Sequence, residues 1–342
     1  MKTEGKRVCE VCGSLVPETS DACPVCVLRG ALNPEDTKTG SSLGPSATQS
    51  ELRFEHYQVL KNEDGTPVEL GRGAMGITYK ALDVDLRCPV TLKVISERYL
   101  GDESAQLRFL REARAAASVR HPNVASVFHL GRTGSSYFYA MEFVEGETLE
   151  HLIRRSGRLE VKSALEITTQ MAAGLAAVHE QNLVHRDIKP SNVLVRLKDD
   201  GSITVKIIDL GLAKAVNEPT AKTAISTPGV FAGTPEFASP EQFAGVQVDI
   251  RSDLYSLGVT LWEMLTGKTL FQGTPGEVMY QHQHAPLPLD QLKGIPQPVV
   301  VLLEVLLDKD PGRRFQNPTE VLNGMATITS TADAQRRITR QS

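Results

Sequence analysis

The segment that decides the fold of this chain reads His185-Arg186-Asp187-Ile188-Lys189-Pro190-Ser191-Asn192-Val193-Leu194, followed after a predicted hairpin by Asp209-Leu210-Gly211. It places a carboxylate, an ammonium group and two oxygen ligands within one turn-and-strand unit. Asp187 has the chemistry to orient a hydroxyl nucleophile, and Lys189 can neutralise a phosphate during transfer. Asn192 and Asp209 offer the hard oxygen ligands that Mg²⁺ prefers. Because γ-phosphoryl transfer depends mainly on positioning and charge neutralisation, the segment predicts this chemistry.

A glycine-rich stretch earlier in the chain fits a phosphate-binding loop. It consists of Gly71, Arg72, Gly73, Ala74, Met75 and Gly76. Glycines let backbone N–H groups approach phosphate oxygens without interference from a Cβ atom. The motif alone is a weak signal, since an ordinary glycine turn has the same composition. Strand-like residues follow it where a dinucleotide-binding fold would begin a helix, which favours a different nucleotide loop.

Two strand-like and three helical segments surround these motifs. Residues 90–95 and 137–143 have strand composition. Apolar spacing predicts a helix over residues 103–119, with Leu107, Leu110, Ala113 and Ala117 on its apolar face, and a second over residues 161–180. Residues 253–266 are apolar nearly all round, which predicts a buried central helix, and Gly267 follows at the C-cap position.

Two later motifs carry further charges. Gly233-Thr234-Pro235-Glu236-Phe237-Ala238-Ser239-Pro240-Glu241 ends in an acidic residue, and Asp310-Pro311-Gly312-Arg313-Arg314-Phe315 offers the arginine that would match it. Between them lies Arg251-Ser252-Asp253. Taken in order, all these motifs resemble those of the eukaryotic-type (bacterial) Ser/Thr protein kinases over about residues 56–322.

This resemblance implies an α+β, two-lobed protein-kinase fold. A small antiparallel β lobe with one key helix is expected before a larger, mainly helical lobe. The predicted boundaries are a zinc ribbon (8–28), a flexible linker (29–53), a kinase domain (54–325) and a polar tail (326–342). Within the kinase domain we expect the N-lobe at about 54–141, the hinge at 142–144 and the C-lobe at about 145–325.

The resemblance also assigns roles in catalysis. Asp187 would orient the substrate hydroxyl, Lys189 would stabilise the transferring group, and Asn192 and Asp209 would hold Mg²⁺ or Mn²⁺. Lys93, paired with Glu112, would align ATP; the alternative is an edge-strand lysine facing water. The remaining ATP-binding residues are expected to be the glycine-rich loop (Gly71 to Gly76), Thr78, Thr91, Met141, Glu142, Val144 and Leu194.

Structural and regulatory roles follow in the same way. Glu241 would be buried against Arg314, and Asp253 would accept bonds from the catalytic-loop backbone. The segment containing Thr220, Thr223, Ser226 and Thr227 is rich in hydroxyl groups. A phosphate there, added by autophosphorylation, would pair with Arg186 and order the segment; otherwise it is simply a polar loop.

Four of the five cysteines form two CxxC pairs, Cys9/Cys12 and Cys23/Cys26, separated by ten residues. Two such knuckles can wrap one tetrahedral Zn²⁺ through four thiolates, which predicts a structural zinc ribbon. Disulfides or free thiols are the competing account. We expect the module to dock a partner or a lobe, because four protein ligands leave no open position for catalysis.

Composition constrains partners and location. The formal net charge of −4 provides no basic field for nucleic acid or an anionic membrane. The N-terminus has no apolar signal core, and the most apolar run, residues 299–307, is too short to span a bilayer. A cytoplasmic enzyme is therefore expected, and the resemblance to protein kinases implies protein substrates. The alternatives are a nucleotide-sensing pseudokinase scaffold without transfer activity and, third, a small-molecule phosphotransferase.

Overall fold

The computed structural model describes residues 6–8, 15–17, 52–73, 76–96, 103–134, 136–210, 234–246 and 248–339, with side chains up to residue 328. Contacts divide the chain into two units, residues 1–50 and 51–342. In the first unit, β1 (Lys6–Val8) pairs with β2 (Leu15–Pro17) in an antiparallel hairpin. The four predicted zinc ligands, including Cys23 and Cys26, lie outside the described residues, so the zinc ribbon stays a prediction.

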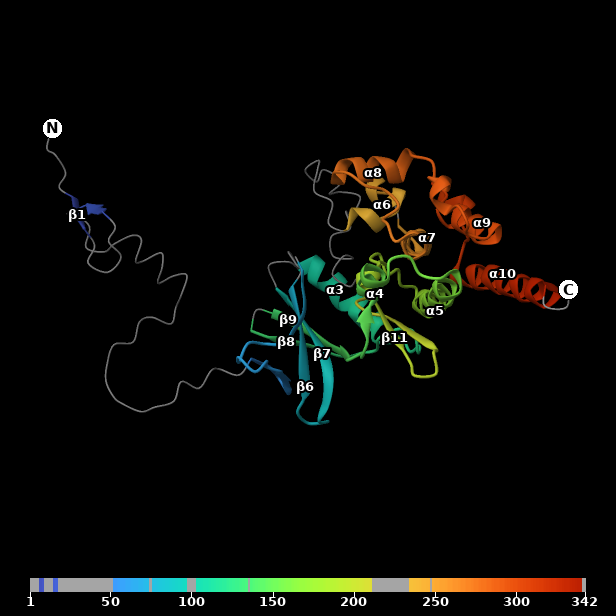
Figure 1. The fold of residues 1–342 in the computed structure, drawn as a ribbon. Coiled ribbons are helices and arrows are strands. Elements are labelled where there is room, and N and C mark those ends of the chain that lie inside the picture. The colour runs from blue at the N-terminus through green and yellow to red at the C-terminus, as the bar shows by residue number, and fades with distance from the viewer. Residues whose placement is uncertain are drawn as a thin grey trace, which may run out of the picture. The chain divides into compact units, whose positions relative to one another are not determined.

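The second unit begins with an antiparallel, seven-stranded sheet (Figure 1). Its strand order is β3-β4-β6-β7-β9-β8, and β5 pairs with β6. The strands are β3 (Arg53–Phe54), β4 (Tyr57–Val59), β5 (Glu69–Gly73), β6 (Gly76–Asp83), β7 (Cys88–Ser96), β8 (Val127–Thr133) and β9 (Ser136–Glu142). Buried and less buried residues alternate along β6, as expected for a strand with one face on a core.

Helix α3 (Glu103–Ala116) packs with this sheet and buries most of the predicted face: Ala113 is in the core, and Leu110 and Ala117 pack against it. Phe109, Ala113 and Ala116 are fully buried in one cluster with Ile95 of β7. Leu107, expected on the apolar face, is 61% exposed, so that part of the prediction was wrong. Spacing alone also allowed a face centred on Phe109, and the large aromatic ring gains more from burial than a leucine at the helix start.

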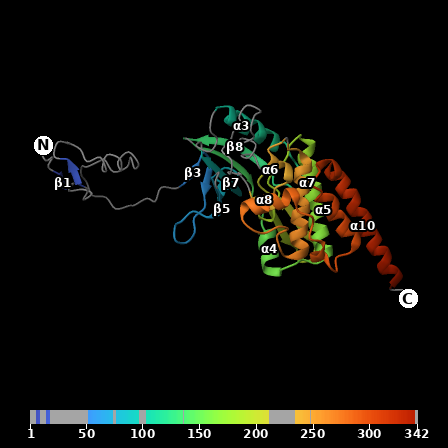
Figure 2. The same ribbon diagram turned by 90° about the horizontal axis from the view of Figure 1, so that it is seen from above.

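Helices dominate the rest of the unit (Figure 2). They are α4 (Leu149–Ser156), α5 (Val161–Glu180), α6 (Pro240–Ala244), α7 (Ile250–Thr266), α8 (Pro275–His284), α9 (Gln297–Leu306) and α10 (Pro318–Thr339). Short 3₁₀ turns lie between them, including η1 (Pro190–Asn192), η3 (Pro235–Phe237), η4 (Leu289–Leu292) and η5 (Pro311–Arg313). The expected α+β fold, a sheet lobe followed by a helical lobe, is confirmed.

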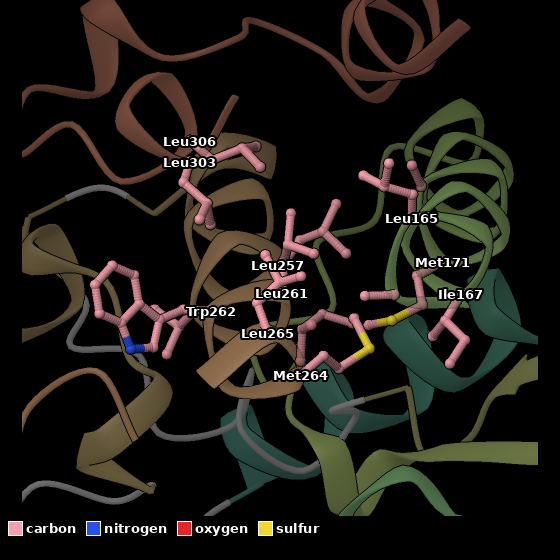
Figure 3. Packing of buried hydrophobic residues seen from close by; sticks show 14 of the residues in the cluster. Leu165, Ile167, Met171, Leu257, Leu261, Trp262, Met264, Leu265, Leu303 and Leu306 are labelled. Atoms are coloured by element: carbon pink, nitrogen blue, oxygen red, sulfur yellow. The ribbon is translucent and has the colours of Figure 1, made fainter. Parts of the chain in front are cut away.

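Helix α7 is the centre of the helical lobe. Its side chains are buried nearly all round, as its sequence predicted. Leu257 and Leu261 lie between the apolar side chains of α5 and those of α9 (Figure 3). Asp249 caps the helix start by accepting from the Arg251 N–H, and Gly267 ends it in the left-handed conformation with φ 71°.

A three-stranded sheet, β10 (Glu147–Thr148), β11 (Val193–Leu197) and β12 (Ile203–Ile207), lies within this lobe. Its antiparallel register places Val193 opposite Ile207. The residues just before β11 and just after β12 therefore come to the same end of the sheet. That end is where the residues of the opening motif meet.

The C-terminal stretch differs from the predicted polar tail. Helix α10 continues through Thr339 and packs against α5. The stretch from Ala326 contains no glycine or proline to stop a helix, and Ile328 packs against the main core. No helix in the described ranges combines the length and apolarity needed to cross a membrane.

Candidate active site

Asp253 of α7 forms hydrogen bonds with the backbone of the loop before η1. Its two carboxylate oxygens accept the backbone N–H groups of His185 and Arg186, each at 2.7 Å. Burial raises the pKa of Asp253 to about 7, although the two N–H bonds act in the opposite direction. Arg186 adopts φ 63°, a left-handed conformation that is uncommon outside glycine. Asp253 thus stabilises a backbone turn that the loop would not adopt alone.

Three side chains of this loop contact one another, and one of them also contacts Thr234, a residue of the later motif from Gly233 to Glu241. The Asp187 carboxylate lies 3.1 Å from the Lys189 Nζ and accepts from the Asn192 amide at 2.9 Å. Lys189 also donates to the Thr234 hydroxyl at 2.9 Å. Lys189 and Asp187 are each less than one-fifth exposed. A carboxylate, an ammonium group and a hydroxyl therefore meet at one point.

The candidate metal ligands lie at the same end of the small sheet. Asn192 precedes β11 and Asp209 follows β12, and the Ile208 N–H donates to the Asn192 carbonyl at 2.9 Å. The Asn192 amide nitrogen donates to the Asp187 backbone carbonyl and side chain, which leaves its Oδ1 as the oxygen for a cation. Asp209 adopts φ 63°. An amide oxygen and a carboxylate at this site suit the oxygen preference of Mg²⁺.

Lys93 makes an ion pair with Asp209, and Tyr139 donates its hydroxyl to the other Asp209 oxygen at 2.8 Å. Burial raises the pKa of the Asp209 carboxyl, but the Lys93 charge and the two side-chain bonds outweigh it, so the pKa is lowered. Glu112 lies 3.6 Å from Arg111, and within the described part of the chain no ion pair joins it to Lys93. The pairing of Lys93 with Glu112 is therefore not the one seen here. The register of β7 and β9 places Lys93 beside Tyr139, and both side chains contact Asp209.

Most of the residues expected around a nucleotide belong to the seven-stranded sheet, and Leu194 belongs to β11. In the glycine-rich loop, Ala74 and Met75 lie outside the described residues, whereas Gly71, Arg72 and Gly73 are exposed on β5. Cross-strand pairing sets Thr78 beside Lys93 and Thr91 beside Met141. Thr91 and Met141 are buried, and Leu194 is half-buried on β11.

Gly76 occupies a position that only glycine can fill. A Cβ atom there would overlap the carbonyl oxygen of Val94 on the neighbouring strand. The third glycine of the loop is thus required by the close pairing of β6 and β7. Gly76 is therefore needed for the pairing of these strands, in addition to any role in phosphate binding.

The expected hinge residues follow β9. The Glu142 N–H donates to the Ser126 carbonyl at 2.9 Å. The Glu142 carboxylate accepts from Lys206 of β12 at 2.7 Å, which ties the end of β9 to the helical lobe. Val144, two residues on, is partly buried.

Glu241 and Arg314 form a buried, two-bonded pair at 2.7 and 2.9 Å. Burial alone would raise the pKa of Glu241, but the bonds and charge of Arg314 outweigh it and lower the pKa. The Ser252 hydroxyl also donates to Glu241. The pair fastens α6, which follows the Thr234 segment, to the start of α7 and to η5.

His282 of α8 is a buried group that the sequence did not single out. Its Nε2 donates to the Glu236 carbonyl (3.1 Å), and its Nδ1 lies 2.8 Å from the Tyr255 hydroxyl, from which a neutral ring accepts. Burial lowers the pKa of His282 to about 3, and the Lys309 ammonium acts in the same direction. The ring thereby holds η3, next to Thr234, against α7 and α8.

Acid should weaken the contacts that His282 makes with Tyr255 and Glu236. Between about pH 6.5, the ordinary pKa of the group, and pH 3, the unfolded chain binds a proton at residue 282 that the folded chain does not. The free energy of unfolding must therefore decrease as the pH is lowered through this window. In urea unfolding, His282→Gln should lack this pH-dependent part of the stability. Its stability deficit relative to wild type should therefore be smaller at about pH 5 than at about pH 7.5, because only the wild type loses stability at residue 282. His284→Gln, an exposed site on the same helix, should leave the pH dependence as in wild type; the same result for His282→Gln would contradict the assignment.

Some predicted residues cannot be placed. Thr220, Thr223, Ser226 and Thr227 fall in residues 211–233, outside the described ranges. Three residues with clear contacts were missed as individuals: Thr234, Tyr139 and His282. Thr234 lies in a motif quoted above, but its contact with Lys189 could not be read from the sequence, because the two residues are 45 positions apart. Tyr139 and His282 were missed for the same reason, because their partners are also distant in sequence.

The sheet lobe, the helical lobe and the charged groups between them define a protein kinase. The chain belongs to the protein kinase domain family, whose model matches residues 66–324. It is 38% identical to the serine/threonine-protein kinase pkn2 of Myxococcus xanthus, over 78% of this chain and 32% of that protein. It is 37% identical to PknL of Mycobacterium tuberculosis, over 72% of this chain and 61% of that protein.

Solved structures agree with the fold. The kinase domain of Mycobacterium tuberculosis PknI superposes with a TM-score of 0.63 at 26% identity, over 82% of this chain and 99% of that one. The catalytic domain is thus similar to those of bacterial serine/threonine kinases. The chain spans less than two thirds of the length of pkn2 and PknL.

Proposed function

We propose that this chain transfers the γ-phosphoryl group of ATP to serine and threonine hydroxyls of proteins, with Mg²⁺ or Mn²⁺ as cofactor. The observation that carries the proposal is the contact of the Asp187 carboxylate with both Lys189 and Asn192. This arrangement puts a proton acceptor, a positive charge and a metal-seeking amide on one short loop. Phosphoryl transfer requires these three functions together.

In this proposal Asp187 orients the acceptor hydroxyl and accepts its proton. Lys189, already 2.9 Å from the Thr234 hydroxyl, compensates the charge of the transferring group. A cation on Asn192 Oδ1 and Asp209 would supply neutralisation of phosphate charge. The ammonium of Lys93 would align the phosphates, with Glu112, 15% exposed on α3, as its partner in the nucleotide-bound protein.

The nucleotide's base would lie between the two lobes. Thr78, Thr91 and Leu194 would contact the purine faces, Met141 would close the back, and backbone groups of Glu142 and Val144 would bond its edge. The glycine-rich loop from Gly71 to Gly76, including Arg72, Gly73, Ala74 and Met75, would cover the phosphates. The supporting facts are the cross-strand pairs Thr78–Lys93 and Thr91–Met141, which put these walls next to the lysine.

Several finer assignments belong to the proposal. Autophosphorylation at Thr223, Ser226 or Thr227 would give Arg186 an anionic partner. The boundaries 8–28, 29–53 and 54–325 are retained, with Cys9, Cys12, Cys23 and Cys26 holding Zn²⁺ in a module that docks a protein; metal analysis of the purified chain tests this. The proposed location is the cytoplasm.

The test is direct transfer. Purified protein incubated with γ-labelled ATP, Mg²⁺ and a generic acceptor protein should place label on serine and threonine, and mass spectrometry should locate it. EDTA should abolish labelling. If the protein binds the nucleotide but labels neither itself nor the acceptor, the scaffold alternative replaces this proposal.

A further inference from the structure

Tyr139 brings a hydroxyl group into the apolar core beneath the sheet. Its side chain is 2% exposed, and its cluster includes Ile95, Phe109 and Leu210. A buried phenol needs a hydrogen-bond partner, whereas an aliphatic residue would fill this space without one. The partner is Asp209, whose Oδ1 accepts the hydroxyl at 2.8 Å. The hydroxyl therefore reaches a proposed metal ligand from the core.

Sheet register explains why this residue and Lys93 act on the same group. Lys93 of β7 and Tyr139 of β9 are direct cross-strand partners, so their side chains leave the sheet side by side on one face. The Lys93 ammonium group donates to Asp209 Oδ2, and the Tyr139 hydroxyl donates to Oδ1. Both oxygens of one carboxylate are thus held by one cross-strand pair.

We infer that Tyr139 is a positioning residue that sets the orientation of the Asp209 carboxylate for the metal ion. The inference rests on the proposed function, in which Lys93 turns to the phosphates and releases Oδ2. The Tyr139 ring is packed in the core, so it stays in place when Lys93 moves and keeps its bond to Oδ1. One oxygen then stays anchored while the other is presented to the cation.

The chemistry of the carboxylate permits this arrangement. Each oxygen has more than one lone-pair direction, so Oδ1 can keep its bond to Tyr139 while the group binds a cation. Asp209 stands on a left-handed backbone directly after β12, with φ 63°. Hydrogen bonds from outside the ligand set commonly fix the orientation of metal-binding groups, and losing one costs about 10- to 100-fold in metal affinity or activity.

The experiment is Tyr139→Phe in the full chain, which deletes one oxygen and keeps the ring. Calorimetry would measure binding of a non-hydrolysable ATP analogue, first in EDTA and then across a Mg²⁺ titration. We expect unchanged binding in EDTA, an apparent Mg²⁺ constant weakened about 10- to 100-fold, and recovery of transfer rate at high Mg²⁺. Tyr139→Met, which refills the space flexibly, provides a second variant with the same expected metal phenotype.

The matched control is Tyr137→Phe, two residues earlier on the same strand face. The Tyr137 ring packs edge-on against Phe109 at 5.9 Å, and its hydroxyl has no hydrogen-bond partner in the described part of the chain. This variant should keep the wild-type Mg²⁺ dependence. A general loosening of the core would affect both variants alike.

Two results would overturn the inference. Wild-type Mg²⁺ affinity in Tyr139→Phe would reduce the hydroxyl to a packing role. Tighter Mg²⁺ binding would mean that the hydroxyl withholds Asp209 from the metal. Failure of the wild-type protein to bind the Mg²⁺-analogue complex would instead refute the proposed function, so the two failures are distinguishable.

Discussion

Replacing Asp187 by asparagine should slow phosphoryl transfer by about 10²- to 10⁴-fold, the usual contribution of a positioned proton acceptor. Asparagine keeps the shape and one acceptor oxygen, so the contacts with Lys189 and Asn192 can persist. What it loses is the negative charge and the ability to take a proton from the acceptor hydroxyl. The measurement is the single-turnover rate of label transfer at saturating Mg²⁺ and ATP.

Nucleotide binding separates this effect from misfolding. Because Asp187 is not a proposed metal ligand, Asp187→Asn should bind the Mg²⁺-nucleotide complex with wild-type affinity. Asp199→Asn, the same change at an exposed residue beyond β11, is the matched control and should transfer at the wild-type rate. An unchanged rate in Asp187→Asn, or loss of nucleotide binding, would remove Asp187 from the role of proton acceptor.

The second large effect is expected on stability, from Arg314→Met. All five guanidinium N–H groups have acceptors: Glu241 twice, and the backbone carbonyls of Arg251, Asp308 and Lys309. The Arg314 side chain is fully buried, and that of Glu241 is 7% exposed. Removing the arginine leaves a buried carboxylate without its counter-ion. Breaking one side of such a pair costs about 3–5 kcal/mol, which is a large share of a domain's total stability.

The neighbouring arginine provides the control. Arg313 is 76% exposed and lies 3.8 Å from Asp310. Exposed pairs of this kind contribute about 0–1 kcal/mol, so Arg313→Met should unfold at nearly the wild-type urea concentration. Adding Glu241→Gln to Arg314→Met should recover part of the loss, because the unpaired charge is then removed. Equal losses in Arg313→Met and Arg314→Met would contradict this account.

Much of the helical lobe could be read from the chain alone. Residues 161–180 were predicted as a helix and form α5 with the same bounds. Helix α7 was predicted to be buried and to end at Gly267, and both features are present. These predictions succeed because the signal is local: apolar periodicity and a glycine at the C-cap act within a few residues. The burial of Phe109 in place of Leu107 on α3 and the length of α10 were missed, because several faces or stop points satisfied the same local rules.

The sequence by itself determined which chemical groups lie on the loop from His185 to Asn192, because eight consecutive residues cannot be far apart. Only the tertiary structure decided which partner each charge takes. Strand register places Lys93 beside Tyr139, and the fold brings both to Asp209, whereas no ion pair joins Lys93 to Glu112 in the described part of the chain. Electrostatic pairing depends steeply on separation and on burial, and neither quantity is encoded in the spacing of residues along the chain.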